Sequence, residues 1–223
     1  RQALVAIQNM NWAALRALDY KIQNINTLSR DHNADPLRRC EVAIKKFGKL
    51  SEAEIVTPAH ICSEMVNLIP DNEWQCIIDN GDKILDIASK VGEFAVAICS
   101  KLKSLGYQSD QFKNSILAIP TSTVAYEFTR RIYEELELDL SCLASNFTAY
   151  DLLDIKNDSG KIDYPRICSI LKQNKPFNSI TLDDTVHEGD EKVNIETVIG
   201  NPPYQDKDGS GGSNDASLYQ YFV

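Results

Sequence analysis

The sequence predicts an α/β fold with a mostly parallel sheet. Short runs of apolar and β-branched residues, which predict strands, occur at residues 83–87, 115–120 and 198–200. The first two runs are each followed by a segment with apolar residues at helical spacing, at about 94–105 and 121–136. This alternation of strands and helices is typical of the βαβ units that build a parallel sheet.

Two parts are expected along the chain. Residues 1–50 predict a helical N-terminal extension, because apolar side chains recur at helical spacing between residues 3 and 27 and again from 37 to 47. Residues 51–223 predict the α/β core, and a segment of that length buries a sizeable hydrophobic interior.

The composition is that of an ordinary globular protein, with 43% hydrophobic and 25% charged residues. No apolar run has the length of a membrane span, and no signal peptide opens the chain, so we expect a cytoplasmic protein without a membrane partner. The six cysteines lie far apart and the three histidines are isolated. This pattern predicts reduced thiols and no metal site.

The first predicted strand leads into a turn that is suited to ligand binding. Its carboxylate, Asp86, is followed by small residues, by Gly92 and then by a helix. In a βαβ unit such a turn lets the backbone approach a ligand, and the N-terminus of the helix faces it. Many strand-to-helix turns share this pattern, so the turn alone does not identify the ligand.

The last predicted strand, which reads as a buried parallel strand, ends in a segment with few hydrogen-bond donors. Gly200 is followed by Asn201, Pro202, Pro203 and Tyr204, and neither proline carries an N–H group. The carbonyl groups and the Asn201 carboxamide oxygen would accept both hydrogens of a planar amino group, which favours a nucleophilic geometry at its nitrogen. Tyr204 would offer a ring face to the same planar group.

Asn201-Pro202-Pro203-Tyr204 resembles the tetrapeptide of S-adenosylmethionine-dependent methyltransferases that modify the N6 position of adenine in DNA. Gln205 and residues 217–223 are similar to the version found in restriction–modification methyltransferases. The resemblance implies a Rossmann-like methyltransferase core, S-adenosylmethionine as cofactor and site-specific methylation of a flipped adenine. It also implies that these four residues are catalytic.

The resemblance extends to the turn after the first strand. The family's loop, Asp-Pro-x-x-Gly-x-Gly-x-Phe, is matched by Asp86, Gly92 and Phe94, and Ala88 lies within it. These four residues are therefore expected to bind the cofactor. Lys90 replaces the first glycine of the loop, so its side chain must leave the pocket or reach the carboxylate of the cofactor.

A helix start is predicted at Thr57 and Pro58, with the threonine as N-cap and the proline at the first helical position. Methyltransferases of this class carry such a Thr-Pro start just before the cofactor strand. There it lines the methionine side of the cofactor. The resemblance implies the same role for Thr57 and Pro58.

Two further carboxylates are candidates for cofactor binding. Nucleotide-binding folds usually end their second strand in an acid that binds the ribose hydroxyls, but this chain has Pro120 there, and Glu127 lies one turn into the next helix. A third strand is expected at 143–153, and in the family an acid at its end accepts the amino group of the cofactor adenine. Asp151 fits that position at a normal loop length, and Asp184 is the alternative.

The net charge of −9 is unusual for a DNA-binding surface, and much of the excess lies in residues 183–208. We therefore expect DNA to be bound through regions mostly outside this chain, with a fused or partner nuclease and a specificity region as further partners. The chain begins at Arg1 and ends soon after the tetrapeptide, which predicts a fragment truncated after the catalytic strand.

Two other functions stay open. The same tetrapeptide marks methyltransferases of protein glutamine amides and of some RNA bases, and all of these targets present a planar amino group. The departures at Lys90 and Pro120 are also compatible with a non-catalytic, methyltransferase-like module for DNA docking.

Overall fold

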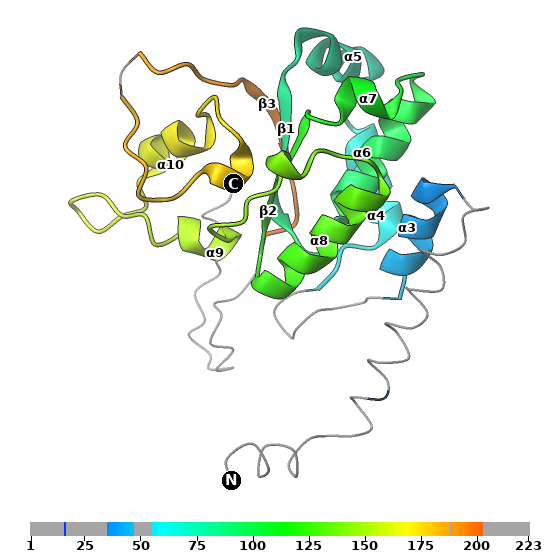
Figure 1. The fold of residues 1–223 in the computed structure, drawn as a ribbon, viewed down its shortest axis with the longest axis horizontal. Helices are drawn as coiled ribbons and strands as arrows, with labels where there is room; N and C mark the ends of the chain where they lie inside the picture. Colours follow the sequence, from blue (N-terminus) through cyan, green and yellow to red (C-terminus); the bar gives the residue numbers. More distant parts are fainter. Residues whose placement is uncertain (1–15, 17–34, 47–54, 188, 203–223) are drawn as a thin grey trace.

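The three strands that the structure describes form one parallel sheet. The structure is a computed structural model, and it describes residues 16, 35–46, 55–187 and 189–202. The strand order is β2-β1-β3 (Figure 1), and all pairings are parallel: β1 (Lys83–Ser89), β2 (Ile116–Pro120) and β3 (Ile195–Ile199). The α/β class and the parallel sheet are thus confirmed.

The strand order indicates where a ligand would bind. The chain passes from β1 to β2 on one side and later returns to the other side of β1 as β3. Open α/β sheets bind ligands where the winding direction reverses, beyond the carboxyl ends of the strands. Here that point lies between β1 and β3, where Asp86 is paired with Ile199. The ladder between β1 and β2 also shifts register between Asp86 and Ser89.

Helices cover both faces of the sheet (Figure 1). On one face, α6 contacts β1 and α8 contacts β2, and two preceding helices pack against α6. Near the other face lie two later helices and an apolar cavity of about 320 Å³, which is lined by both β1 and β3 residues. The bounds are α3 (Pro36–Ile44), α4 (Ala59–Asn67), α6 (Glu93–Ser104), α8 (Thr123–Glu135), α9 (Ala149–Leu152) and α10 (Tyr164–Leu171).

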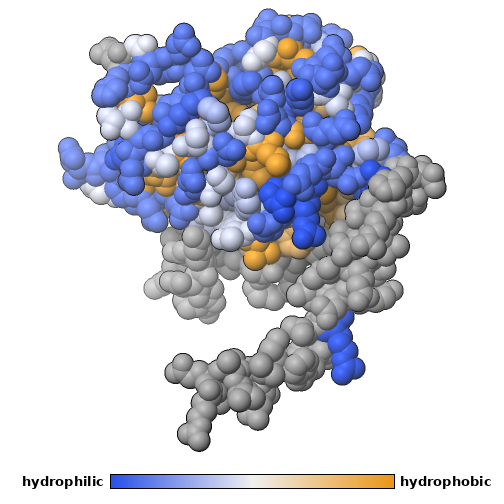
Figure 2. Space-filling model, in the orientation of Figure 1, coloured by the Kyte–Doolittle hydropathy of each residue, from blue (hydrophilic) through white to orange (hydrophobic). Residues whose placement is uncertain are grey.

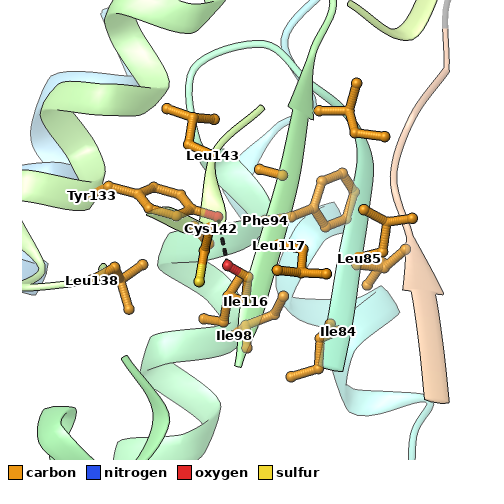
Figure 3. Packing of buried hydrophobic residues seen from close by; sticks show 14 of the residues in the cluster. Ile84, Leu85, Phe94, Ile98, Ile116, Leu117, Tyr133, Leu138, Cys142 and Leu143 are labelled. Atoms are coloured by element: carbon orange, nitrogen blue, oxygen red, sulfur yellow. Dashed lines mark hydrogen bonds between the residues drawn. The ribbon is translucent and has the colours of Figure 1, made fainter. Parts of the chain in front are cut away.

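The hydrophobic core lies between the sheet and α6 and α8 (Figure 3). Ile84 and Ile116 of the strands are fully buried, as are Ile98 of α6 and Tyr133 of α8. The Tyr133 hydroxyl donates a hydrogen bond of 3.2 Å to the Ile116 carbonyl, so its polar atom is satisfied inside the core. The visible outer face is mainly hydrophilic (Figure 2), and none of the helices described is long and apolar enough to cross a membrane.

Most of the predicted elements within the described residues are confirmed. Strands β1 and β2 and helices α3, α6 and α8 lie where helical spacing or apolar runs predict them. Helix α5 (Asp71–Asn80) was not predicted, although Pro70 before it, acidic residues in its first turn and Gly81 at its end are ordinary helix signals. The remaining elements are short: α7 (Ser109–Phe112), η1 (Leu140–Cys142) and η2 (Phe177–Ser179).

Two expectations about strands are wrong. The predicted third strand at 143–153 is reduced to a single bridge, in which Leu143 pairs with Ala118 beside β2. The chain then enters α9, because Thr148 and Asp151 form a capping box. Strand β3 is parallel as predicted but not buried: within the described sheet it is an edge strand, and Val198 is 57% exposed. The helix expected between residues 3 and 27 lies outside the described residues, apart from the helical Arg16.

Candidate functional site

The carboxyl ends of β1 and β3 meet because Gly200 has no side chain. A Cβ atom built on Gly200 would lie 3.2 Å from Ile87 Cγ2 and 3.4 Å from the Ile87 backbone nitrogen. The distance of 3.2 Å is tighter than most real contacts of a Cβ atom. The glycine therefore lets the end of β3 approach the turn after β1, and Asn201 follows directly beside that turn.

Asp86 lies in β1 beside the end of β3, and one of its side-chain oxygens has no hydrogen-bond partner among the described residues. Asp86 is fully buried, and its Oδ1 atom accepts a long hydrogen bond of 3.4 Å from the Ala88 backbone nitrogen. Among the described residues, Oδ2 has no hydrogen-bond partner. Burial, followed by the negative charge of Glu93, raises the pKa of Asp86 to about 8. A positively charged or hydrogen-bond-donating ligand would satisfy this carboxyl group.

Glu93 gives the turn a second buried carboxylate. It is the first residue of α6 and is 3% exposed. Its oxygens accept the backbone N–H groups of Val91 at 3.0 Å and Thr57 at 3.4 Å. Backbone donors next to the start of α6 are thus already used by a carboxylate. Because helix N-termini bind phosphates through such donors, this turn suits a cationic group better than the phosphates of a dinucleotide.

Gly92 is required for the shape of the turn. Its φ of 76° lies in the left-handed region, which L side chains rarely adopt. A Cβ atom here would also lie 2.9 Å from Cγ2 of Ile132 on α8. The glycine thus allows both the tight turn and the close packing of α8 against it.

Lys90 links this turn to Asn201. It is 1% exposed, and its Nζ donates a hydrogen bond of 2.7 Å to the Asn201 backbone carbonyl. The Asn201 carboxamide in turn donates from Nδ2 to Thr57 Oγ1 at 3.1 Å. The structure therefore brings together three segments that sequence analysis selected separately: Thr57, the turn after β1, and Asn201.

Thr57 and Pro58 have different positions from those predicted by the helix-start pattern. Pro58 is the N-cap of α4, and no side chain caps the helix. Thr57 lies one residue before it, 5% exposed, with its hydroxyl group on Asn201 rather than on the helix. Pro58 is exposed and, like Thr57, lines a cavity of about 690 Å³ beside α3 and α4. The helix boundary was thus wrong by one residue, and Thr57 is placed beside Asn201 at the end of β3.

The remaining predicted residues of the turn are buried by packing. Phe94 is 1% exposed and belongs to the hydrophobic core beside β1 (Figure 3). Ala88 is 2% exposed. Pro202 is buried, whereas Pro203 and Tyr204 lie outside the described residues. The stacking role of Tyr204 thus stays a prediction.

Glu127 and Asp151 both make hydrogen bonds to residues three positions away. The Glu127 side chain is 54% exposed and pairs with Arg130 at 3.0 Å on the surface of α8. Asp151 lies at the third position of α9, not at a strand end, and its Oδ2 accepts both the backbone N–H and the hydroxyl group of Thr148 at 2.7 Å. The alternative, Asp184, accepts from Lys175 and Thr181 within its own loop.

The missing acid at the end of β2 has a structural explanation. Ser122 is the N-cap of α8, and its hydroxyl oxygen accepts the backbone N–H of Ala125 at 3.2 Å. Thr121 is fully buried and donates its backbone N–H to the Ser89 carbonyl at 3.0 Å. The segment after β2 therefore forms a hydrogen bond with the end of β1 and starts α8.

Sequence analysis missed the role of Glu93 and the contact made by Lys90. An acidic residue directly after a glycine at a helix start was the available signal for Glu93, because carboxylates are favoured there. No local signal predicts the Lys90–Asn201 contact, since it joins residues 111 positions apart. Among the described residues, no group of three or more His, Cys, Asp or Glu side chains is placed to hold a metal ion.

The junction between the carboxyl ends of β1 and β3 thus combines two buried carboxyl groups, one buried lysine and an asparagine at a strand end that is followed by proline. Such a site can hold a cationic ligand beside acceptors for an amino group. Comparison of the chain with protein-family models, with curated proteins and with solved structures gives no match.

Proposed function

We propose that this chain is an S-adenosylmethionine-dependent methyltransferase that acts on the N6 amino group of adenine in DNA. The observation that carries the proposal is the position of Asn201. It lies at the carboxyl end of β3 and is hydrogen-bonded to Thr57 and to Lys90 of the turn after β1. The two motifs that the resemblance assigns to catalysis and to cofactor binding are therefore neighbours.

The electrostatics of the turn fit the proposed cofactor. When bound, S-adenosylmethionine supplies a methyl group on a positively charged sulfonium. Asp86 and Glu93 are both buried, and Oδ2 of Asp86 has no hydrogen-bond partner in the described part of the chain. A bound cation would favour the ionised form of Asp86. The charges of Asp86, Glu93 and Lys90 would then sum to −1, so a ligand of net charge +1 would leave the site neutral. We assign Asp86, Glu93 and Thr57 to the cofactor side of the junction.

Asn201 and Pro202 would receive the target amino group. The carboxamide oxygen of Asn201 and the carbonyl of Pro202 accept its two hydrogens and stabilise positive charge that develops on the nitrogen. A base inside duplex DNA cannot reach this site, so the adenine must flip out of the helix. Stacking of the flipped base on Tyr204 is part of the proposal.

A second candidate is methylation of a glutamine amide in a protein. The net charge of −9 favours it, because a DNA backbone is repelled by an acidic surface. The amide nitrogen presents the same planar NH2 group to Asn201 and Pro202. If DNA is the substrate, we expect regions outside this chain to bind the backbone.

Two measurements on the full chain test the proposal. Calorimetric titration with S-adenosylmethionine should give saturable binding, and no heat at millimolar ligand would contradict a cofactor site. Transfer of a radiolabelled methyl group should then be compared for unmethylated plasmid DNA and for glutamine-containing peptides. Label in N6-methyladenine supports the first candidate, whereas label only in peptide supports the second.

A further inference from the structure

We infer that Lys90 is a positioning residue that holds the Asn201–Pro202 peptide in register with the turn after β1. This inference rests on the proposed methyltransferase function. It assigns a role to Lys90, which replaces the first glycine of the loop found in the methyltransferase family. The resemblance itself assigns no role to a lysine at this position.

The end of β3 needs a side chain to hold it. The last residue of β3 in the ladder with β1 is Ile199, paired with Asp86. Pro202 and Pro203 follow Asn201 and carry no N–H group, so the backbone cannot continue the ladder. Residues outside β3 provide the contacts instead. Lys90 binds the main chain of Asn201, and Thr57 binds its carboxamide.

The contact made by Lys90 is strong by its geometry and its burial. Nζ lies 2.7 Å from the Asn201 carbonyl oxygen, and Lys90 is 1% exposed. Hydrogen bonds from a charged donor are shorter and stronger than neutral ones, and burial strengthens them further. The positive charge of Lys90 acts to lower the pKa of Asp86, so the ammonium group interacts electrostatically with that carboxyl group.

The contact made by Lys90 fixes Asn201 relative to the turn after β1. Glu93 accepts the backbone N–H groups of Val91 and Thr57. The Thr57 hydroxyl group accepts a hydrogen bond from the Asn201 side chain, and Lys90 donates one to the main-chain carbonyl of Asn201. Asn201 is therefore fixed at two points relative to the same turn. Because methyl transfer requires donor and acceptor in line, a loss of this restraint should reduce the rate of transfer rather than cofactor affinity.

The alternative role for Lys90 is direct binding of the cofactor carboxylate. The two roles predict that substitution of Lys90 changes different kinetic quantities. A residue that positions Asn201 changes the maximal rate at saturating cofactor, whereas a carboxylate ligand changes the dissociation constant of S-adenosylmethionine.

The test compares Lys90→Met with Lys83→Met in the full chain. Lys83 is the matched control, because its Nζ donates to the Asn114 carbonyl at 2.9 Å at the opposite end of β1. For Lys90→Met we expect the methyl-transfer rate at saturating S-adenosylmethionine to fall about tenfold or more, with the dissociation constant changed less than about threefold. Lys83→Met should leave both values unchanged. Weaker cofactor binding with an unchanged maximal rate would overturn the inference.

Hydrogen exchange without ligand separates this inference from the proposed function. Lys90→Met should raise amide exchange in residues 195–201 by about tenfold, because the end of β3 loses its restraint. If the unmodified chain transfers no methyl group, the proposed function fails, and exchange alone decides the role of Lys90. Unchanged exchange overturns the inference in either case.

A second variant covers loss of folding. Should circular dichroism show that Lys90→Met does not fold, Lys90→Arg retains the charge but moves the donor. A reduced maximal rate with unchanged cofactor affinity in Lys90→Arg supports the positioning role. Any other result for that variant contradicts it.

Discussion

Gly200 lies against Ile87 so closely that a Cβ atom on the glycine would be 3.2 Å from Ile87 Cγ2. This contact brings the end of β3 against β1 and so determines the position of Asn201, the next residue. The first prediction concerns this position. Gly200→Ala should retain the fold with a loss of about 1 kcal/mol, whereas Gly200→Val should destabilise by about 2–3 kcal/mol because it overpacks the contact. Urea unfolding of both variants checks the order, and equal stabilities would contradict it.

Gly92 provides a second prediction, with Gly81 as its matched control. The two glycines have nearly the same φ, 76° and 75°. A Cβ on Gly92 meets Ile132 at 2.9 Å, whereas a Cβ on Gly81 meets nothing within 4 Å. Gly81→Ala should therefore cost about 1–2 kcal/mol from backbone strain alone, and Gly92→Ala about 1–3 kcal/mol more from overpacking. Thermal or urea unfolding measures the difference, and similar losses would show that α8 moves away freely.

Asn201→Ala tests the catalytic assignment, with Asn194→Ala as control. Asn194 is an exposed asparagine just before β3, and its carboxamide donates a hydrogen bond of 3.1 Å to the neighbouring Glu196 carboxylate. Loss of an acceptor for developing charge should reduce methyl transfer about a hundredfold or more. The dissociation constant of S-adenosylmethionine should change little. Equal losses of transfer and of cofactor binding would indicate a structural role for Asn201.

The buried Asp86 predicts a pH dependence of stability. Burial, and then Glu93, raises its pKa from 3.8 to about 8 in the folded chain. Between these values the folded protein keeps a proton that the unfolded chain releases, so the free energy of unfolding should fall as pH rises and level off above about pH 8. The expected slope from this group is at most about 1.4 kcal/mol per pH unit.

Asp86→Asn isolates that contribution. The variant cannot ionise at this position, so its unfolding free energy should lose the slope between about pH 5 and pH 8, and it should exceed that of the unmodified chain at pH 8. Asp158→Asn, at an exposed turn position, should retain the slope. Urea unfolding across this pH range makes the comparison. An unchanged slope in Asp86→Asn would show that Asp86 is ionised in the folded chain.

Local sequence patterns determined the elements that form the core. Apolar runs predicted β1 and β2, helical spacing predicted α6 and α8, and Gly200 followed by Asn201 and Pro202 marked the end of β3. These features are encoded within a few residues, because strand and helix periodicity and the absence of proline N–H groups are local properties. The α/β class followed from them.

Only the tertiary structure decided which polar residues meet. Lys90 contacts a residue 111 positions away, and Thr57 contacts one 144 positions away, so no local pattern contains either pair. Conversely, Glu127 and Asp151 looked suitable by spacing, but both carboxylates bind partners three residues away. The physical reason is that packing of the sheet brings distant side chains together, whereas helix surfaces and capping boxes use acidic side chains for local hydrogen bonds.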